Sequence, residues 1–197
     1  MDSIIQLIAS QIDSKAIGSV SEELGVDEQH LQKAVGMALP LLLGALDRNA
    51  SSSDGAEALS AALDRDHDGS IFNDLPAAVK SPKTRKDGAA ILGHVLGDTS
   101  GDVMNSVGRA TKIDTQHVAS IFATVAPVVL GAVGQMKREK NLDAQGVSSM
   151  LHEERKTVEG ASSALTQLLD MDGDGDVSDE VISLGSSLLG GLLSGNK

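Results

Sequence analysis

An internal repeat is the feature that most restricts how this chain can fold. The segments "VDEQHLQKAVGMALPLLLGAL" (26–46) and "IDTQHVASIFATVAPVVLGAV" (113–133) align without gaps at an offset of 87 residues. Both are apolar, and each carries a proline at the same place, Pro40 in the first and Pro127 in the second. Two copies are too few for a solenoid, so the repeat predicts a pseudo-symmetric pair of units.

Each repeat begins with a signal for the start of a helix. Asp27 and Asp114 are predicted as N-caps, and the apolar residue before each one can pack on the first turn. The helices are expected at about 28–47 and 115–138. Both prolines then fall inside a helix, where each removes a backbone hydrogen bond and clashes with the preceding turn. We therefore expect both helices to bend at proline.

The remaining helices follow from apolar residues at helical spacing. They are predicted at about 3–17, 54–63, 88–97, 101–111, 144–157, 160–169 and 180–193, with "KSPKTRKDG" (80–88) as a linker. The chain has two Phe and no Trp or Tyr, so its core must be aliphatic, which favours packing of helix on helix. No segment shows the pattern of a strand.

The predicted fold is therefore all-α. It is a helical domain built from two diverged repeats, each with a Pro-kinked helix and an acidic loop. Residues 1–110 hold the N-terminal helix and the first repeat, with an acidic loop at 64–75. Residues 111–197 hold the second repeat, with a helical insertion and an acidic loop at 170–181. We expect the two to form one compact unit.

The two acidic loops predict calcium binding. "LDRDHDGSIFNDL" (63–75) and "LLDMDGDGDVSDEV" (168–181) each place three aspartates on alternate positions before a glycine. Hard cations such as Ca²⁺ take six to eight oxygen ligands from loops of this kind. An Asp- and Gly-rich turn without an ion is the alternative. Two such loops in one chain, each with an apolar residue at its eighth position (Ile71 and Val177), favour the metal.

The loops resemble those of EF-hands and suggest two calcium sites. The predicted ligands of the first are Asp64, Asp66, Asp68, the Ser70 carbonyl and Asp74; those of the second are Asp170, Asp172, Asp174, the Asp176 carbonyl and Glu180. The usual glutamate at position 12 is replaced by Leu75 and Val181, which predicts a shortened loop and weaker binding. Ile71 and Val177 are expected to point into the core, and His67 to face solvent.

The chain also resembles a bacterial family of domains of unknown function that includes the YidB-like proteins. The resemblance lies in "ALPLLLGAL" and "VAPVVLGAV", in the loop "LLDMDGDGDVSDEV" and in the tail "LGSSLLGGLLSG". It implies a helical bacterial protein and gives no established activity.

The search for a catalytic site finds none. His30 and His117 occupy matching places in the two repeats, and a role at the helix start is favoured over catalysis. "HEER" (152–155) lacks the second histidine of a zinc-protease helix and is expected to be a solvated charged face. The basic residues of 80–86 are expected to be solvated too. Neither a nucleophile elbow nor a phosphate-binding loop is present.

Charge and hydropathy restrict the partners. A net charge of −12 argues against nucleic acid. The N-terminal segment has no basic region and is predicted to be an amphipathic helix rather than a signal peptide. No segment has the roughly 20 apolar residues that span a bilayer. The cytoplasm is therefore expected, with export without an N-terminal signal as the alternative, because weak calcium sites fill most easily outside the cell.

The C-terminal tail suggests self-association. In "SLGSSLLGGLLSGNK" the residues Leu184, Leu188 and Leu192 share one face of a helix that is rich in glycine and needs something to pack against. The expected function is a calcium-binding structural or interaction protein that forms homo-oligomers through this helix. The alternatives are a calcium sensor or buffer, and an enzyme whose site the fold assembles from distant residues. The six methionines are scattered, which disfavours the Met-rich surface of a sensor.

Overall fold

The computed structural model describes residues 3–12 and 14–169. The second acidic loop and the Leu/Gly tail lie outside the described residues. The predicted helix 180–193 is therefore outside the described residues. So are the predicted calcium ligands of the second loop, Asp170, Asp172, Asp174, Asp176 and Glu180.

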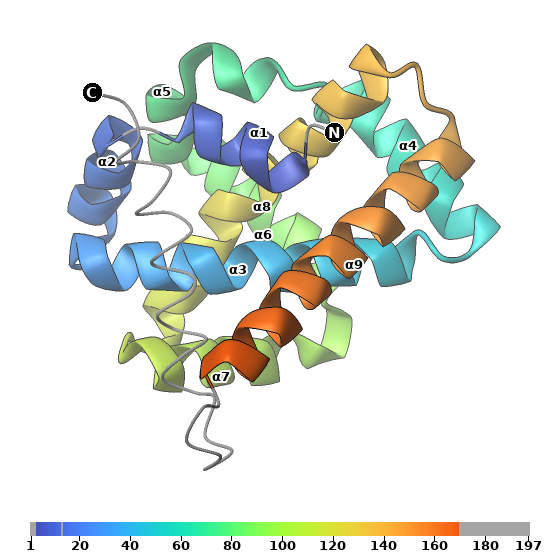
Figure 1. Cartoon of the computed structure of the whole chain (residues 1–197). Coiled ribbons are helices and arrows are strands. Elements are labelled where there is room, and N and C mark those ends of the chain that lie inside the picture. Colours follow the sequence, from blue (N-terminus) through green and yellow to red (C-terminus); the bar gives the residue numbers. More distant parts are fainter. Residues whose placement is uncertain (1–2, 13, 170–197) are drawn as a thin grey trace.

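Every regular element in the described residues is helical, which confirms the all-α prediction (Figure 1). The elements are, in order, α1 (Ile4–Gln11), α2 (Ser14–Leu24), α3 (Glu28–Asn49), α4 (Ser53–Asp66), the 3-10 helix η1 (Ser70–Asp74), α5 (Leu75–Lys80), α6 (Pro82–Val95), the 3-10 helix η2 (Gly97–Thr99), α7 (Ser100–Thr111), α8 (Thr115–Glu139) and α9 (Ala144–Leu169).

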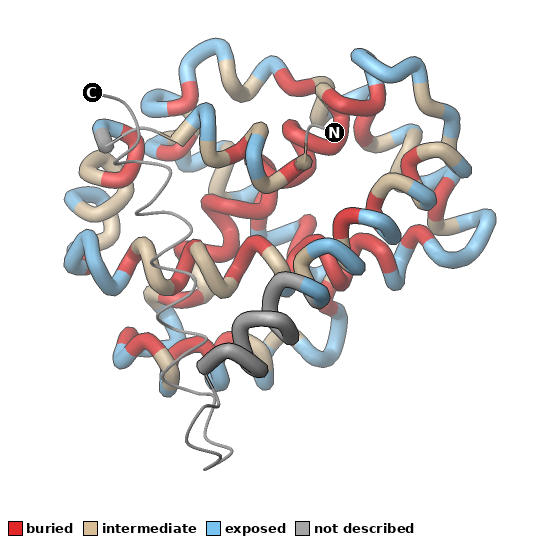
Figure 2. Tube along the Cα trace, viewed as in Figure 1, coloured by how far each residue is buried: buried red, intermediate tan, exposed pale blue. Residues whose placement is uncertain are grey.

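The second proline helix, α8, is the centre of the fold. It packs against α1, α3, α4, α6 and α7, and its middle is buried on all sides (Figure 2). Small and β-branched residues such as those of "ATVAPVVLGAVG" let several helices approach it closely. Among the described residues, α8 alone is long and apolar enough to cross a membrane. In this fold 83% of the apolar 18-residue stretch of α8 is buried, as in the core helix of a globular protein.

The two proline helices begin in the same way. Asp27 accepts hydrogen bonds from the backbone N–H groups of Gln29 and His30, and Asp114 accepts the corresponding two. Both N-cap predictions are confirmed. Two residues before each cap, Gly25 and Lys112 have positive φ values of 64° and 59°. These local features recur at the 87-residue offset, while the two-fold relation between whole repeats stays a prediction.

Both long helices continue through their prolines. α3 contains Pro40 and α8 contains Pro127 in the interior. The bend that we expect at each proline stays a prediction. The observed bounds, Glu28–Asn49 and Thr115–Glu139, agree with the predicted ones within a few residues.

The predicted linker 80–88 is wrong, because this segment is the start of α6. Pro82 occupies the first turn, where its missing N–H and fixed φ are compatible with a helix. Further along, a Cβ at Gly88 would lie 1.7 Å from the carbonyl oxygen of Ala123 on α8. The backbones of α6 and α8 therefore touch at this glycine, and tertiary packing fixes the helix.

Two other boundaries also differ from the prediction. The helix expected at 3–17 ends at Gln11, where Ile12 is extended, and a second helix follows. α1 buries Ile4 and Ile8, and α2 buries Ala16 and Ile17, so the break lets each helix turn its own apolar face inward. The helices expected at 144–157 and 160–169 form one continuous helix, α9.

Polar contacts hold α9 against the rest of the fold. Asp47 on α3 is 7% exposed, and its carboxylate receives Arg155 Nε at 2.6 Å. His152 Nδ1 lies 3.5 Å from the other oxygen of the same carboxylate. Glu154, 8% exposed, accepts hydrogen bonds from the hydroxyl of Ser3 and, at 3.2 Å, from the N–H of Ile5. The prediction of a solvated face at 152–155 is wrong for Glu154 and Arg155.

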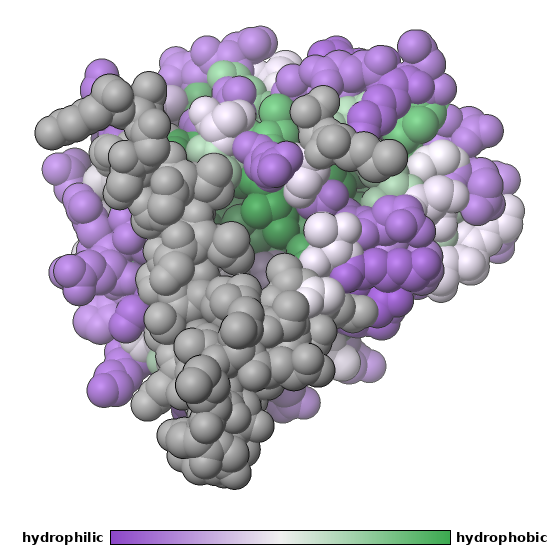
Figure 3. Space-filling model, in the orientation of Figure 1, coloured by the Kyte–Doolittle hydropathy of each residue, from purple (hydrophilic) through white to green (hydrophobic). Residues whose placement is uncertain are grey.

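The face shown in Figure 3 has an apolar centre. Hydrophobic side chains gather between α1 and α3, with hydrophilic side chains around them. Behind this face, residues of α1, α2, α3, α5 and α8 line a narrow apolar cavity, among them Ile8, Ile17, Val35 and Val128. The core is aliphatic there, as the composition predicted.

Candidate cation-binding loop

The first acidic loop joins α4 to α5 through a tight turn. α4 continues through Asp66, so Asp64 and Asp66 still belong to the helix. The backbone then turns at Gly69, whose φ of 92° is in the left-handed region that favours glycine. Asp68 Oδ1 accepts the Ser70 N–H at 3.0 Å and closes the turn. A Cβ at Gly69 would also lie 2.8 Å from Cβ of Gln135, so space requires glycine here too.

The loop rests directly on the C-terminal half of α8. A Cβ at Gly134 would lie 1.9 Å from the His67 carbonyl oxygen, and one at Gly131 would lie 2.6 Å from Cγ2 of Ile71. Ile71 packs against the hydrophobic core, which confirms the orientation predicted for the eighth position of the loop. These two glycines of α8 therefore provide the space in which the loop is held.

Basic residues at the end of α8 neutralise two of the predicted calcium ligands. Lys137 Nζ donates to Asp64 Oδ1 in an ion pair, and the Lys137 side chain is only 10% exposed. Arg138 Nη1 donates to Asp68 Oδ2 at 3.2 Å. The charge repulsion that a run of carboxylates would suffer is thus reduced by two cations from the other repeat. These partners are 73 and 70 residues away along the chain, so no local pattern in the sequence indicates them.

The other predicted ligands also have local partners. Arg65 Nε donates to Asp66 Oδ2 at 2.6 Å on the surface. Asp74 is the N-cap of α5 and accepts the Ala77 N–H at 3.2 Å. Within residues 3–12 and 14–169, no three His, Asp or Glu side chains lie close enough together to hold one metal ion.

Hydrogen bonds keep Asp68 ionised. The hydroxyl and the N–H of Ser70 stabilise the carboxylate and, together with the nearby Arg138 guanidinium, hold the pKa of Asp68 below its usual value. A deprotonated carboxylate on the solvent side of the loop is available to a cation at neutral pH.

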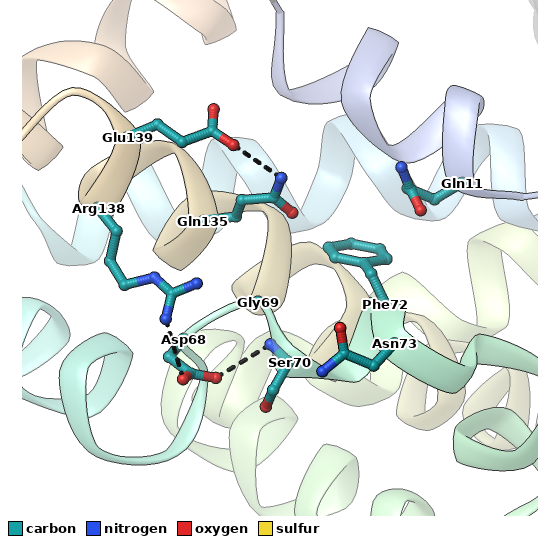
Figure 4. Close-up of a pocket in the computed structure, with 9 residues that line it drawn as sticks. All are labelled: Gln11, Asp68, Gly69, Ser70, Phe72, Asn73, Gln135, Arg138 and Glu139. Atoms are coloured by element: carbon teal, nitrogen blue, oxygen red, sulfur yellow. Dashed lines mark hydrogen bonds and ion pairs between the residues drawn. The ribbon is translucent and has the colours of Figure 1, made fainter.

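Beside the loop lies an open polar hollow of about 620 Å³ (Figure 4). Gln11 of α1 faces it from one side, and Gln135 and Glu139 of α8 from the other, where Gln135 Nε2 donates to Glu139 Oε1 at 2.8 Å. Phe72 and Asn73 of η1 complete the lining. The hollow shares Asp68 with the loop, so a cation at Asp68 would sit at its edge.

His67 does not face solvent, contrary to the prediction. Its side chain is 9% exposed and its Nε2 lies 3.9 Å from Oδ2 of Asp87 on α6. Burial lowers the pKa of His67, and this effect outweighs the neighbouring Asp87 and Asp66, which raise it. Asp87 therefore belongs to the surroundings of the loop although it is distant in sequence.

The paired histidines lie beside their own N-caps. His30 Nδ1 is 3.6 Å from Asp27 Oδ1, and His117 Nδ1 forms an ion pair with Asp114. The hydrogen bond from His117 lowers the pKa of Asp114. Both imidazoles are close to half exposed, at 46% and 45%. These contacts agree with a role at the helix start.

Comparison with known proteins identifies a family. The model of a family of bacterial proteins of unknown function (DUF937) matches residues 6–136, which is more than half of the chain. The chain belongs to the DUF937 family. Neither the curated proteins nor the solved structures yield a match.

The DUF937 match covers part of what suggested the resemblance. It starts within α1 and ends near the end of α8, so it includes both proline helices and the first acidic loop. The second loop and the Leu/Gly tail, which carry part of the resemblance, lie outside it. α9 lies outside the matched residues as well.

Proposed function

We propose that this chain is a calcium-binding structural or interaction protein whose ion sites are the loops 64–75 and 170–181. The conformation of the first loop carries the proposal. Gly69 adopts a positive φ directly after the three alternate aspartates, and Asp68 folds back on Ser70. Ca²⁺-binding loops need this kind of sharp turn at the glycine after their third carboxylate. The same residue pattern recurs at 170–176.

Calcium would enter from the solvent side of the loop. Asp66 and Asp68 have exposed carboxylates, and their present partners Arg65 and Arg138 are largely exposed as well. Exposed ion pairs contribute only about 0–1 kcal/mol each, so a divalent ion can displace them at small cost. Asp64 is held by the more buried Lys137, and its recruitment requires that side chain to withdraw. This competition is consistent with weak binding.

A structural role fits the core better than a sensor role. Sensors expose flexible methionine-rich surfaces when they bind calcium. Here Met104 and Met136 are buried, at 3% and 2% exposure. The calcium sensor or buffer stays as the alternative. A sensor would differ from a structural protein because it exposes a large apolar surface when it binds calcium. An enzyme is the further alternative.

Thermal denaturation in EGTA and in millimolar Ca²⁺ tests the proposal. An ion at 100 times its Kd stabilises the folded state by about 2.7 kcal/mol per site if only that state binds it. We expect Ca²⁺ to raise the Tm of the full chain. Asp68→Asn, in the first loop, and Asp172→Asn, in the second, should each reduce this increase in Tm. Glu57→Gln, an exposed change on α4, is the matched control and should behave as wild type.

A Tm that is the same in EGTA and in Ca²⁺ contradicts the proposal. In that case the first loop is an ionic contact between α4 and α8 that needs no metal. Binding of an apolar dye measured in the same samples separates the structural protein from the sensor, because only a sensor exposes new apolar surface when calcium binds.

A further inference from the structure

Among the described residues, the buried side chain of His67 has no hydrogen-bond partner. It is 9% exposed, and its Nε2 lies 3.9 Å from Oδ2 of Asp87, beyond hydrogen-bond distance. Within the described part of the chain, the imidazole makes no hydrogen bond. Buried polar groups in native proteins are almost always satisfied, and an exception indicates a bound water or ion.

The imidazole faces a hollow whose charge favours a cation. This hollow of about 250 Å³ lies between the acidic loop, α5, α6 and α8. Among the described residues that line it are Asp66, Asp68, Asp87 and Lys83. Arg65 and Arg138 pair with Asp66 and Asp68, so the carboxylate that faces His67 directly is that of Asp87. The hydroxyl-bearing residues Ser70 and Thr84 complete its polar lining. The group that satisfies His67 is therefore expected to be positively charged.

We infer that His67 and Asp87 bind a divalent transition-metal ion, with Zn²⁺ as its representative. Zinc lies about 2.0–2.1 Å from a histidine nitrogen and about 2.0–2.2 Å from a carboxylate oxygen. Around a tetrahedral ion two such ligand atoms lie about 3.3–3.5 Å apart. His67 Nε2 and Asp87 Oδ2 are 3.9 Å apart, so the two side chains must approach by only about 0.5 Å to share one ion. Imidazole combined with carboxylate selects zinc and its neighbours over calcium or magnesium.

The remaining coordination positions are open to solvent. No third His, Asp or Glu of the described residues is in a ligand position. Water therefore completes the shell, together with Asp66, which lines the same hollow and is paired with the exposed Arg65. Two side chains, His67 and Asp87, are in place, and Asp66 can become the third ligand if its side chain rotates. Such a site binds zinc more weakly than a structural centre with four protein ligands.

Backbone packing prepares His67 for this role. The contact between the His67 carbonyl and Gly134 fixes the backbone of the residue on α8. Asp87 is held equally well, since the adjacent Gly88 fixes α6 against α8.

This site differs from the proposed calcium site. Asp66 is common to both, but His67 and Asp87 are not among the calcium ligands, so variants of these two residues test the zinc site separately. Calcium titration of a variant that lacks His67 should give the wild-type result, whether or not zinc binding is affected.

Isothermal titration of the full chain with ZnCl₂ tests the inference. We expect His67→Gln and Asp87→Asn to weaken the tightest binding event at least about tenfold, since loss of a ligand removes a large part of the affinity. His94→Gln is the matched control, because it removes an exposed imidazole from the same helix as Asp87. It should leave the isotherm unchanged. Unchanged binding in His67→Gln overturns the inference.

A second measurement covers the case in which the His67 variant does not fold. Nuclear magnetic resonance of the wild-type chain follows the imidazole ¹H signals during addition of Zn²⁺. We expect the His67 signal to shift before those of the exposed histidines. Shifts confined to the other histidines overturn the inference as well.

Discussion

Replacing Gly88 by alanine should push α6 away from α8. The added Cβ would lie 1.7 Å from the carbonyl oxygen of Ala123, 2.6 Å from its carbonyl carbon and 2.9 Å from its Cα. All three are backbone atoms of the central helix and cannot rotate away. To reach the 3.0 Å that real Cβ atoms keep, the two helices must separate by about 1.3 Å at this point.

The cost can be estimated from two opposing effects. Alanine is better than glycine inside a helix by about 1 kcal/mol. Inserting a methyl group into a well-packed core costs about 1–3 kcal/mol, and more where backbone must move. The second effect prevails, so Gly88→Ala should destabilise the fold. For a chain of this size, 1 kcal/mol corresponds to about 2–4 °C in Tm.

Gly93 on the same helix is the matched control. In the described part of the chain, no atom other than its own neighbouring backbone lies within 4 Å of the Cβ that alanine would add there. Gly93→Ala should therefore raise Tm by about 2–4 °C through helix propensity alone. Circular dichroism at the helical band follows both melts, because the chain has no Trp for fluorescence. A Gly88→Ala variant as stable as Gly93→Ala would refute the close contact of α6 and α8.

Three further predictions concern pH, the α9 contacts and the tail. Burial lowers the pKa of the His67 imidazole from its usual 6.5 in the folded chain. As pH falls below about 6.5, the unfolded chain therefore takes up this proton more readily than the folded chain, and the free energy of unfolding decreases. With a chelator present, the Tm of His67→Gln should fall less than that of wild type between about pH 7.5 and 5.5. Asp47→Ala removes the buried carboxylate that Arg155 and His152 contact, and should cost about 1–3 kcal/mol in urea denaturation, less than for a fully buried pair. Glu153→Gln at an exposed site should change stability by no more than about 0.5 kcal/mol. Light scattering of the full chain should show calcium-dependent association that is absent from a chain ending at Ile182, and a full chain that is monomeric in every condition rules out self-association through the tail.

Local signals in the sequence determined the helices and their starts. Asp27 and Asp114 cap α3 and α8 because a short acidic side chain can reach the free N–H groups of the next turn without help from the rest of the fold. The aliphatic composition likewise favoured helices packed on helices. The orientation of Ile71 was predictable from the eighth position of an EF-hand-like loop, which is apolar in both copies of the loop.

Contacts between distant residues were decided only by the tertiary structure. Lys137 and Arg138 reach the acidic loop because Gly131 and Gly134 let it lie on α8, and no spacing along the chain records that approach. The burial of His67 beside Asp87 has the same origin. Charge partners and burial depend on which helix faces pack together, a property of the whole fold, whereas a cap or an apolar period depends on neighbours a few residues away.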